Sequence, residues 1–445
     1  MAETDRTVNV GLIGLGTVGG GVAKVMARHR DEYRSAYGID VRIKRACALE
    51  EERARELGFE GDAFTQNWQD IVSDPDIDIV VELIGGEHPA TEIFEGALGS
   101  GKHVVSANKA LLGRHVERLA GIAAEHGVQI RCEASAGGGI PIVNALEHAL
   151  VGNEVLTVAG ILNGTTNYIL SRMDAEGLDF DEVLADAQRL GYAEADPTAD
   201  VDGFDAASKV AILSSIAFHT RVTTDDVFME GIRDVSAADI AEARSMGYVV
   251  KLLGIARNTA DGVDVRVHPT MIPADHMLAS VSGAMNAVYV VGDAVGETMF
   301  YGAGAGSFPT ASAVVGDILA LADAISHNDH VQAEIKPFGR VLPLKSIEDL
   351  STKYYIRLAV EDRVGALAPV VDVFARHQIS ISQISQLADA DEGRCSVVFL
   401  THKASERDVA AARTELESLD VVERVASVIR IEDVEAWSEG AEANE

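Results

Sequence analysis

The sequence predicts an α/β protein built from three successive parts. As far as residue 150, short strands rich in Val and Ile alternate with helix-like segments. A mixed α+β pattern follows up to residue 307, and the last hundred residues have the order strand, helix, strand, strand, helix, strand. The alternation predicts a parallel sheet with helices on both faces, and the final order is that of a small ferredoxin-like domain.

Composition and charge limit the class of partner. The chain has 445 residues, of which 47% are hydrophobic and 24% charged, with a net charge of −33. Because a nucleic-acid binder needs a basic surface, we expect no nucleic-acid partner. No signal peptide is recognised, no uncharged apolar run approaches about 18 residues, and the three cysteines are widely separated. We therefore expect a cytoplasmic protein with no membrane partner.

The predicted elements follow from periodicity and from residue type. In the first part, strands are predicted at 8–14, 41–49, 76–85 and 102–109, with helices at 20–29 and 90–101. A long apolar helix at 310–325 is expected to return to this part. The predicted domains are therefore 1–150 completed by 308–330, then 151–307, a linker at 331–350 and a last domain at 351–445.

A glycine motif, GLGTVG, follows the first strand and opens the first helix. Gly14 allows the tight turn, Gly16 lets the backbone approach a pyrophosphate, and Gly19 permits close packing of helix on strand. The motif predicts a Rossmann-like domain that binds NADP or NAD. After the second strand, Glu50 favours a free ribose hydroxyl, whereas Arg53 or Arg55 could hold a 2′-phosphate, so the choice of cofactor stays open.

Two further segments follow predicted strands of the same sheet. Lys109 ends the segment SANK, where it can reach a nicotinamide and a substrate; the alternative is a surface lysine. The segment from Glu133 to Ile140 combines a carboxylate with exposed carbonyls that could hold a hard cation, although its glycines could equally make a tight turn. The neighbouring Cys132 is expected to be structural.

An acidic stretch precedes a second lysine. Five carboxylates are followed by Lys209, and Asp205 and Lys209 are spaced to share one helix face. A lysine held beside carboxylates can donate a proton, and the alternative is a surface ion pair. The five carboxylates are Glu194, Asp196, Asp200, Asp202 and Asp205.

The motifs taken together resemble one family. GLGTVG, SANKA, CEASAGGGIP, GILNGTTNYIL, GYAEADPTADVDGFDAASK and YGAGAGSFPTASAVVGD occur in this order and resemble homoserine dehydrogenase over about residues 8–325. The last domain resembles an ACT domain around residues 361–367, with Val364 where such turns often carry proline. The resemblance implies reversible NAD(P)-dependent hydride transfer between L-homoserine and L-aspartate 4-semialdehyde. That reaction belongs to the biosynthesis of threonine, methionine and isoleucine.

The resemblance also implies roles for single residues. Lys209 would be the proton donor in reduction and the base in oxidation, and Lys109 would contact cofactor and substrate. Glu194 and Asp205 would bind the amino acid end of the substrate, supported by Asp200. The other implied contacts are Gly14, Gly16, Thr17, Val18, Gly19, Gly191, Gly304 and Gly306 with the cofactor, Glu133, Ala136, Gly138 and Ile140 with a sodium ion, and Asp362, Gly365 and Leu367 with threonine as effector.

Two alternative functions and the assembly state follow from the same residues. A cysteine-dependent semialdehyde dehydrogenase would use Cys132 as its nucleophile. A non-catalytic amino-acid sensor would use the ACT domain and would not need Lys209. Because ferredoxin-like domains commonly pair their sheets, we expect a homodimer or homotetramer.

Overall fold

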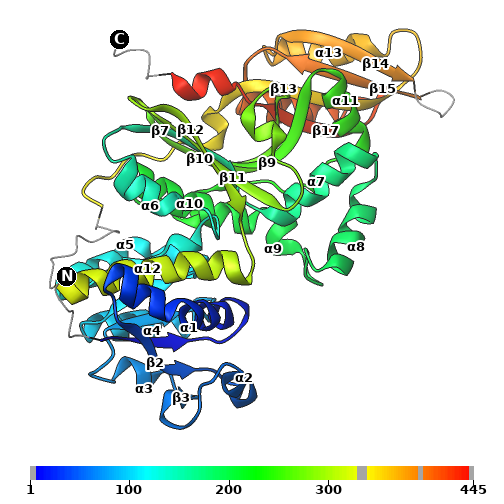
Figure 1. The fold of residues 1–445 in the computed structure, drawn as a ribbon. Helices are drawn as coiled ribbons and strands as arrows, with labels where there is room; N and C mark the ends of the chain where they lie inside the picture. The colour runs from blue at the N-terminus through cyan, green and yellow to red at the C-terminus, as the bar shows by residue number, and fades with distance from the viewer. Residues whose placement is uncertain (1–6, 328–337, 389–393, 440–445) are drawn as a thin grey trace.

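The computed structural model describes residues 7–327, 338–388 and 394–439. Its first part contains a six-stranded sheet in which every pair is parallel (Figure 1). The order β3-β2-β1-β4-β5-β6 is that of a Rossmann fold, as predicted. The strands are β1 (Val8–Ile13), β2 (Val41–Cys47), β3 (Phe64–Thr65), β4 (Ile79–Glu82), β5 (His103–Ser106) and β6 (Ile130–Arg131).

Different helices cover the two faces of this sheet. On one face, α1 (Thr17–Tyr37) and α12 (Ser307–His327) pack on alternate β1 residues such as Val10 and Leu12. On the other face lie α3 (Gln69–Val72), α4 (Ala90–Gly99) and α5 (Lys109–His126). The central strands β1 and β4 are buried on both faces, which explains why they read as continuous apolar runs.

Helix α12 confirms the predicted return of the chain to the first domain. By length and hydropathy it is the one helix among the described residues that could cross a membrane. Half of its most apolar window is buried inside the fold, where it packs along α1 (Figure 1). Its apolar character is therefore that of a core helix.

The second part builds a mixed sheet with helices beneath it. Helix α10 (Phe204–Phe218) is buried along almost its whole length, because it lies between this sheet and α5 of the first part. Strand β9 (Tyr248–Thr259) was not predicted, and it pairs along its full length with β10 (Gly262–Pro273). The other elements are β7 (Val155–Ile161), α7 (Gly164–Glu176), α8 (Phe180–Leu190), α9 (Thr198–Val201), β8 (Phe228–Met229), α11 (Ala237–Ser245), β11 (Met285–Gly292) and β12 (Gly296–Ala303).

The predicted linker lies partly outside the described residues. From 338 onward it runs along the second part and is held there by hydrogen bonds. Leu342 N donates to Thr220 Oγ1 at 2.9 Å, and Val263 N donates to Pro343 O at 2.8 Å. This stretch is therefore fixed to the domain that it follows.

The C-terminal part confirms the predicted ferredoxin-like order. A short strand, β16 (Ala404–Ser405), is added before the second helix. The elements are β13 (Ser351–Glu361), α13 (Leu367–Arg376), β14 (Ile381–Ala388), β15 (Arg394–Thr401), α14 (Glu406–Leu416) and β17 (Val422–Ile431).

The C-terminal sheet is not separate from the sheet of the second part, although the predicted division into domains had implied that it would be. Strand β17 pairs with β10 at Thr270↔Arg430 and Met271↔Ile431. The two sheets thereby join into one of eleven strands (Figure 1). Nine of them follow the order β12-β11-β7-β9-β10-β17-β13-β15-β14, and the short strands β8 and β16 pair with β10 and β13.

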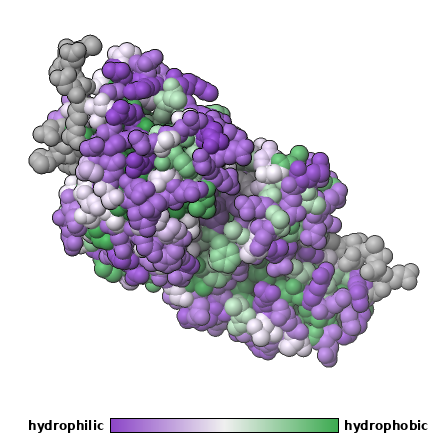
Figure 2. Space-filling view, turned by 90° about the horizontal axis from the view of Figure 1, so that it is seen from below, coloured by the Kyte–Doolittle hydropathy of each residue, from purple (hydrophilic) through white to green (hydrophobic). Residues whose placement is uncertain are grey.

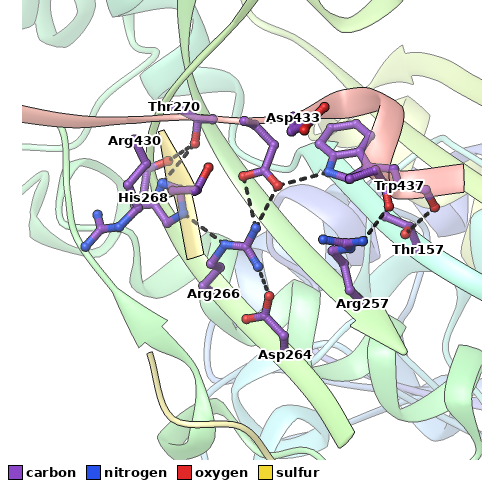
Figure 3. Close-up of polar contacts among 12 residues, drawn as sticks. Thr157, Arg257, Asp264, Arg266, His268, Thr270, Arg430, Asp433 and Trp437 are labelled. Carbon is purple, nitrogen blue, oxygen red and sulfur yellow. Dashed lines mark hydrogen bonds and ion pairs between the residues drawn. The ribbon is translucent and has the colours of Figure 1, made fainter. Parts of the chain in front are cut away.

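A buried polar network secures this joint (Figure 3). The fully buried Arg266 of β10 donates from Nη2 to both carboxylate oxygens of Glu432, at 2.8 and 2.9 Å, and pairs with Asp264. Its Nε donates to Nε2 of His268 at 3.2 Å. Burial, followed by the nearby arginines, holds the pKa of His268 well below its usual value, so a neutral ring accepts this bond.

The residues after β17 fold back onto the sheet of the second part. Trp437 is 1% exposed and packs in an apolar cluster with Ile272 and Tyr289. Its indole Nε1 donates to Glu432 at 3.1 Å, and its carbonyl accepts from Thr157 Oγ1 at 3.0 Å (Figure 3). The segment up to Ser438, predicted as part of the last domain, therefore completes the core of the second one.

The outer surface agrees with the composition. Hydrophilic side chains cover most of the face seen from below, with hydrophobic groups in smaller patches between them (Figure 2). Since acids outnumber bases by 70 to 37 over the whole chain, the polar surface is predominantly acidic.

Candidate active site

The glycine motif forms the turn between β1 and α1. Gly14 has φ +100°, and a Cβ there would lie 2.8 Å from the backbone of Leu83. A Cβ on Gly19 would lie 1.9 Å from the carbonyl oxygen of Gly14, whereas Gly16 faces open space. Gly14 and Gly19 therefore need glycine for two different reasons within the fold itself, a left-handed turn and a close helix–strand contact. The open space at Gly16 leaves room for a ligand to approach the backbone.

A crevice of about 490 Å³ opens at this turn. It lies at the carboxyl ends of β1, β2 and β4, where the strand order reverses. The N-terminus of the long helix α1 contributes Gly16 and Thr17 to its wall, and free N–H groups at a helix start attract an anion. These residues fit the pyrophosphate of a dinucleotide.

Two opposed charges lie at the ribose side of the crevice. Glu50 precedes α2 (Glu51–Glu56), and Arg53 on that helix donates from Nε to Leu15 O at 3.3 Å, across the glycine turn. Arg55 instead pairs with Glu51 at 2.9 Å and does not line the crevice. Of the three candidate residues, Glu50 and Arg53 line the crevice, so these two would determine whether it accepts the ribose hydroxyl of NAD or the 2′-phosphate of NADP.

The two predicted lysines meet on one carboxylate. Lys209 Nζ lies 2.7 Å from Asp205 Oδ2, and Lys109 Nζ lies 2.7 Å from Asp205 Oδ1. Lys209 also donates to the carbonyl oxygen of Leu162 at 2.7 Å. The side chain of Lys209 is only 8% exposed, whereas that of Lys109 is 45% exposed.

The elements explain why these groups converge. Lys109 is the first residue of α5, directly after β5, and Asp205 and Lys209 lie one turn apart on α10. Because α10 packs against α5, residues about a hundred positions apart come together at the junction of the first two domains. The spacing of Asp205 and Lys209 had predicted their shared helix face.

The charges of the cluster are strongly coupled. Burial lowers the pKa of Lys209, and the neighbouring Lys109 lowers it further, against the opposing effect of Asp205. Burial opposes ionisation of Asp205, but the two lysines more than offset this and lower its pKa. The pKa of Lys109 is raised despite its desolvation, mainly by Asp205 and then by Asp200 and Glu194.

Asn163 is a site residue that the sequence analysis missed. Its side-chain Nδ2 donates to Asp200 at 2.7 Å and to Asp205 at 2.9 Å, while its Oδ1 caps α7 by accepting from Thr166 N. Burial raises the pKa of Asp200. Asn163 stands at a recognisable N-cap position before Gly164, and this was the available signal.

Glu82 is a second residue that was not predicted, and it positions Lys109 through the preceding Asn108. Glu82, at the end of β4, is fully buried and accepts from Ser106 Oγ at 2.9 Å and Asn108 Nδ2 at 3.2 Å. Its other oxygen accepts from the backbone of Ile84 and Gly85. Asn108 caps α5 immediately before Lys109, so this carboxylate fixes the helix start.

The predicted glycines of the later motifs lie where helices and strands end: Gly191 follows α8, and Gly304 and Gly306 lie between β12 and α12. Gly304 contacts Gly138 so closely that a Cβ on Gly138 would lie 2.3 Å from the Gly304 oxygen. Gly306 precedes α12 with φ +123°, and Ser307 Oγ donates to Thr17 O at 2.7 Å. Gly191 ends α8 in a left-handed conformation and is exposed, as is Glu194.

The predicted cation loop is well ordered by its own hydrogen bonds. The Glu133 oxygens accept from Val143 N at 2.9 Å and Asn144 N at 2.7 Å, and the Ile140 carbonyl accepts from Ile142 N at 2.8 Å. Glu133 thus caps α6 (Ile142–Asn144). The described residues contain no group of three or more His, Cys, Asp or Glu that could hold a metal ion, so any ion here would rest mainly on backbone carbonyls.

The predicted effector loop lies between β13 and α13. Gly365 has φ +87°, Val364 is fully exposed, and Asp362 is exposed. Leu367 begins α13 and packs against the core of the C-terminal domain. This loop shares no residue with the lysine cluster or the crevice.

Fold and site together define a dinucleotide-binding dehydrogenase, with a glycine crevice and a lysine–carboxylate cluster at the ends of parallel strands. Family models agree: "Homoserine dehydrogenase, NAD binding domain" matches 14–133, "Homoserine dehydrogenase" 141–319 and "ACT domain" 354–421. The chain belongs to the homoserine dehydrogenase family and carries a C-terminal ACT domain. The predicted fold class and oxidoreductase activity are thereby confirmed.

Individual relatives support the same assignment. The homoserine dehydrogenase of a Synechocystis species is 44% identical over 434 residues, covering 96% of this chain and 99% of its own. The crystal structure of a homoserine dehydrogenase from Thiobacillus denitrificans has a TM-score of 0.91 and 44% identity, over 96% of this chain and 99% of that one. A hyperthermophilic archaeal homoserine dehydrogenase in complex with NADPH has a TM-score of 0.61 and 27% identity, over 71% of this chain and 97% of its own.

The family assignment excludes both alternative functions. The nucleophile required by a cysteine-dependent enzyme, Cys132, is fully buried. A sensor without catalysis would leave the paired lysines without a role, and family models of the dehydrogenase cover both of the first two domains.

Proposed function

We propose that this chain interconverts L-homoserine and L-aspartate 4-semialdehyde, with Lys209 as the residue that moves the proton. The observation that carries the proposal is the single buried carboxylate, Asp205, shared by two lysines at 2.7 Å each. The bound nicotinamide supplies or accepts the hydride. Lys209 donates a proton to the carbonyl oxygen in reduction and removes the hydroxyl proton in oxidation.

The hydrogen bonds of the acidic residues support two proposed roles for them. Asp205 Oδ2 already accepts from Lys209 and Asn163, and Oδ1 accepts from Lys109. Asp205 therefore orients the lysines more than it binds substrate. Glu194 and Asp200, which both raise the pKa of Lys109, are left to hold the ammonium group of the substrate. Asp202 pairs with Arg233 and Asp196 caps Thr198, so both are structural.

The cofactor is proposed to be NADP or NAD, bound in the crevice by Gly14, Gly16, Thr17, Val18 and Gly19. The loop glycines Gly191, Gly304 and Gly306, together with Lys109, would contact it from the catalytic side. A sodium ion is proposed at the carbonyls of Ala136, Gly138 and Ile140 beside Glu133, which rates measured in sodium and in choline chloride would test. The pathway role and the cytoplasmic location follow from the family resemblance.

Threonine is the proposed effector, binding at Asp362, Gly365 and Leu367 where ACT domains of two copies meet in a homodimer or homotetramer. The fully exposed Val364 beside Gly365 supports this, because a large apolar side chain at a turn favours a protein contact. Mass measurement in solution and inhibition by threonine test the two halves of this proposal.

The central test compares wild-type protein with Lys209→Gln in the oxidation of L-homoserine with NAD and with NADP. We expect turnover in the wild type and a loss of about 10²- to 10⁴-fold in kcat for the variant. Cofactor binding should be retained, and Lys403→Gln, at a half-exposed lysine of the ACT domain, serves as control. Absence of wild-type turnover with both cofactors would overturn the function, whereas an unaffected Lys209→Gln would overturn only the role of Lys209.

A further inference from the structure

A second cavity, of about 530 Å³, lies between the ACT domain and the catalytic domain. One wall is the strand β17 from Arg424 to Ile429, with Arg357 of β13 and Arg413 of α14. The opposite wall comprises Pro269 and the segment 230–236 of the catalytic domain. It shares no residue with the nucleotide crevice, the lysine cluster or the loop at Gly365.

The sheet joint explains why this space exists. Strands β10 and β17 pair only at Arg430 and Ile431, so the outer edge of β17 has no strand beside it at 424–429. The pairing of β17 with β13 shifts register twice there, leaving Glu423 and Ala426 as extra residues. Such bulges bend a strand and redirect its side chains, which here opens the gap beside the joint of Figure 3.

Most of the charged groups in the walls are neutralised within the protein. Arg357 donates to Asp239 at 2.7 Å and to Ser236 Oγ at 3.0 Å, and Arg413 donates from Nε to Glu417 at 3.1 Å. Glu230 pairs with Arg430. The charges of these three wall residues are therefore already offset by partners within the protein.

Two charges remain, one on each wall. Arg424 on the ACT side and Asp234 on the catalytic side form no ion pair with any residue that the structure describes. Arg413, which lines the same wall as Arg424, has two further nitrogens besides the Nε that donates to Glu417, while Val235, Val425 and Val428 provide apolar surface. A ligand that satisfies both walls needs an anionic group and a cationic group on a compact, partly apolar body.

We propose that this cavity binds a free α-amino acid. Its carboxylate would lie on Arg424 and Arg413, its ammonium group on Asp234, and its side chain against the valines. Guanidinium–carboxylate pairs of this kind are among the stronger hydrogen bonds in proteins. The inference goes beyond the proposed function, because it assigns a second binding site outside the active site. Binding to this second site can be measured without turnover.

The wall on the catalytic side also contacts the substrate site. Ile232 N donates to Val201 O at 2.8 Å, and Arg233 pairs with Asp202 at the end of α9. The same short helix carries Asp200, which Asn163 ties to Asp205. An amino acid that draws 230–236 towards β17 therefore acts on the residues that grip the substrate. The expected signature is a change in the KM for L-homoserine that exceeds any change in kcat.

The test is titration calorimetry on the full-length protein with the twenty standard L-amino acids and, for the tightest binder, its analogue without the amino group. Arg424→Gln should weaken both ligands about tenfold, because it removes one charge-assisted hydrogen bond. Asp234→Asn should weaken the amino acid similarly but leave the analogue unchanged. Arg407→Gln, an exposed arginine on the same helix as Arg413 but outside the cavity, should change neither.

Three results would overturn the proposal. The first is that no amino acid binds the wild-type protein, and the second is that binding persists unchanged in both cavity variants. The third is that Asp362→Asn, in the proposed effector loop, abolishes binding while the cavity variants do not. Homoserine oxidation without added amino acid should persist in the cavity variants, so a failure of the cavity proposal is distinguishable from a failure of the dehydrogenase assignment.

Discussion

At the scale of single residues, Asp205 sets the electrostatics of the site. One carboxylate holds a buried lysine and a half-exposed one, and their pKa values are shifted in opposite directions. The buried lysine has the lowered pKa, as a base that must be neutral in oxidation requires. The exposed one stays charged and can attract the anionic parts of cofactor and substrate.

The pH dependence of homoserine oxidation is expected to follow Lys209. Since the neutral form of Lys209 is the proposed base, kcat should rise with pH through a pKa below the ordinary lysine value of 10.5. Asp205 stabilises the ammonium form, so Asp205→Asn should lower this pKa and move the rising limb to lower pH, even if kcat itself falls. The measurement is kcat against pH for both proteins. A limb that moves to higher pH would contradict the assignment.

The choice of cofactor is also decided by single residues. Arg53 lies across the glycine turn and Glu50 beside it. Arg53→Gln should raise the KM for NADP several-fold more than that for NAD, because it removes a partner for the 2′-phosphate. Glu50→Gln should lower the KM for NADP relative to that for NAD. Equal effects on both cofactors would show that these side chains do not contact the ribose.

At the scale of elements, local patterns predicted most of the Rossmann and ACT strands and the backbone roles of Gly14 and Gly19, because each depends on residues close in sequence. Strand β9 was missed, although it pairs fully with β10. Asn163 and Glu82 were missed as site residues because their importance lies in partners that only the folded chain brings near. The pairing of β10 with β17 could not be predicted either, since no local pattern specifies which edges meet.

The buried pair of Arg266 and Glu432 is expected to hold this joint. Glu432→Ala leaves the buried guanidinium of Arg266 with Asp264 as its one remaining carboxylate partner, and breaking such a pair costs about 3–5 kcal/mol. The chain has two tryptophans, so in a Trp68→Phe background the fluorescence of Trp437 reports the joint. Denaturant unfolding should show this decrease in the free energy of unfolding. The control Glu348→Ala, which breaks an exposed ion pair with Arg407, should lower the free energy of unfolding by about 0.5 kcal/mol or less. Equal, small effects would mean that the joint is held by packing alone.

At the scale of the whole molecule, the ACT domain is structurally part of the enzyme. Its edge strand extends the catalytic sheet, and the tail beyond it carries Trp437 into the catalytic core. The archaeal relative of known structure covers only 71% of this chain, so related enzymes exist in a shorter form. In this chain, the strand that pairs with β10 and a residue of the catalytic core, Trp437, both lie in the C-terminal quarter.

Truncation after Val341 is therefore expected to cost stability as well as regulation. It would uncover the edge of β10 and open the cluster that Trp437 fills, and exposed edges and apolar patches promote aggregation. A lower melting temperature and oligomer formation are expected, with any remaining activity insensitive to threonine. Full-length Trp437→Ala separates the effect of the core residue from that of the edge. A truncated chain as stable and monodisperse as the full protein would contradict this interpretation.

The position of β17 within the joined sheet has a consequence for how the protein is made. Among the strands that the structure describes it is synthesised last, yet it lies between β10 and β13 in the finished sheet. During translation, the earlier domains leave the ribosome while the edge of β10 still lacks its neighbour. The nascent enzyme therefore passes through an interval in which its catalytic domain has been synthesised but the edge of β10 is unpaired, and this interval ends when β17 has left the ribosome.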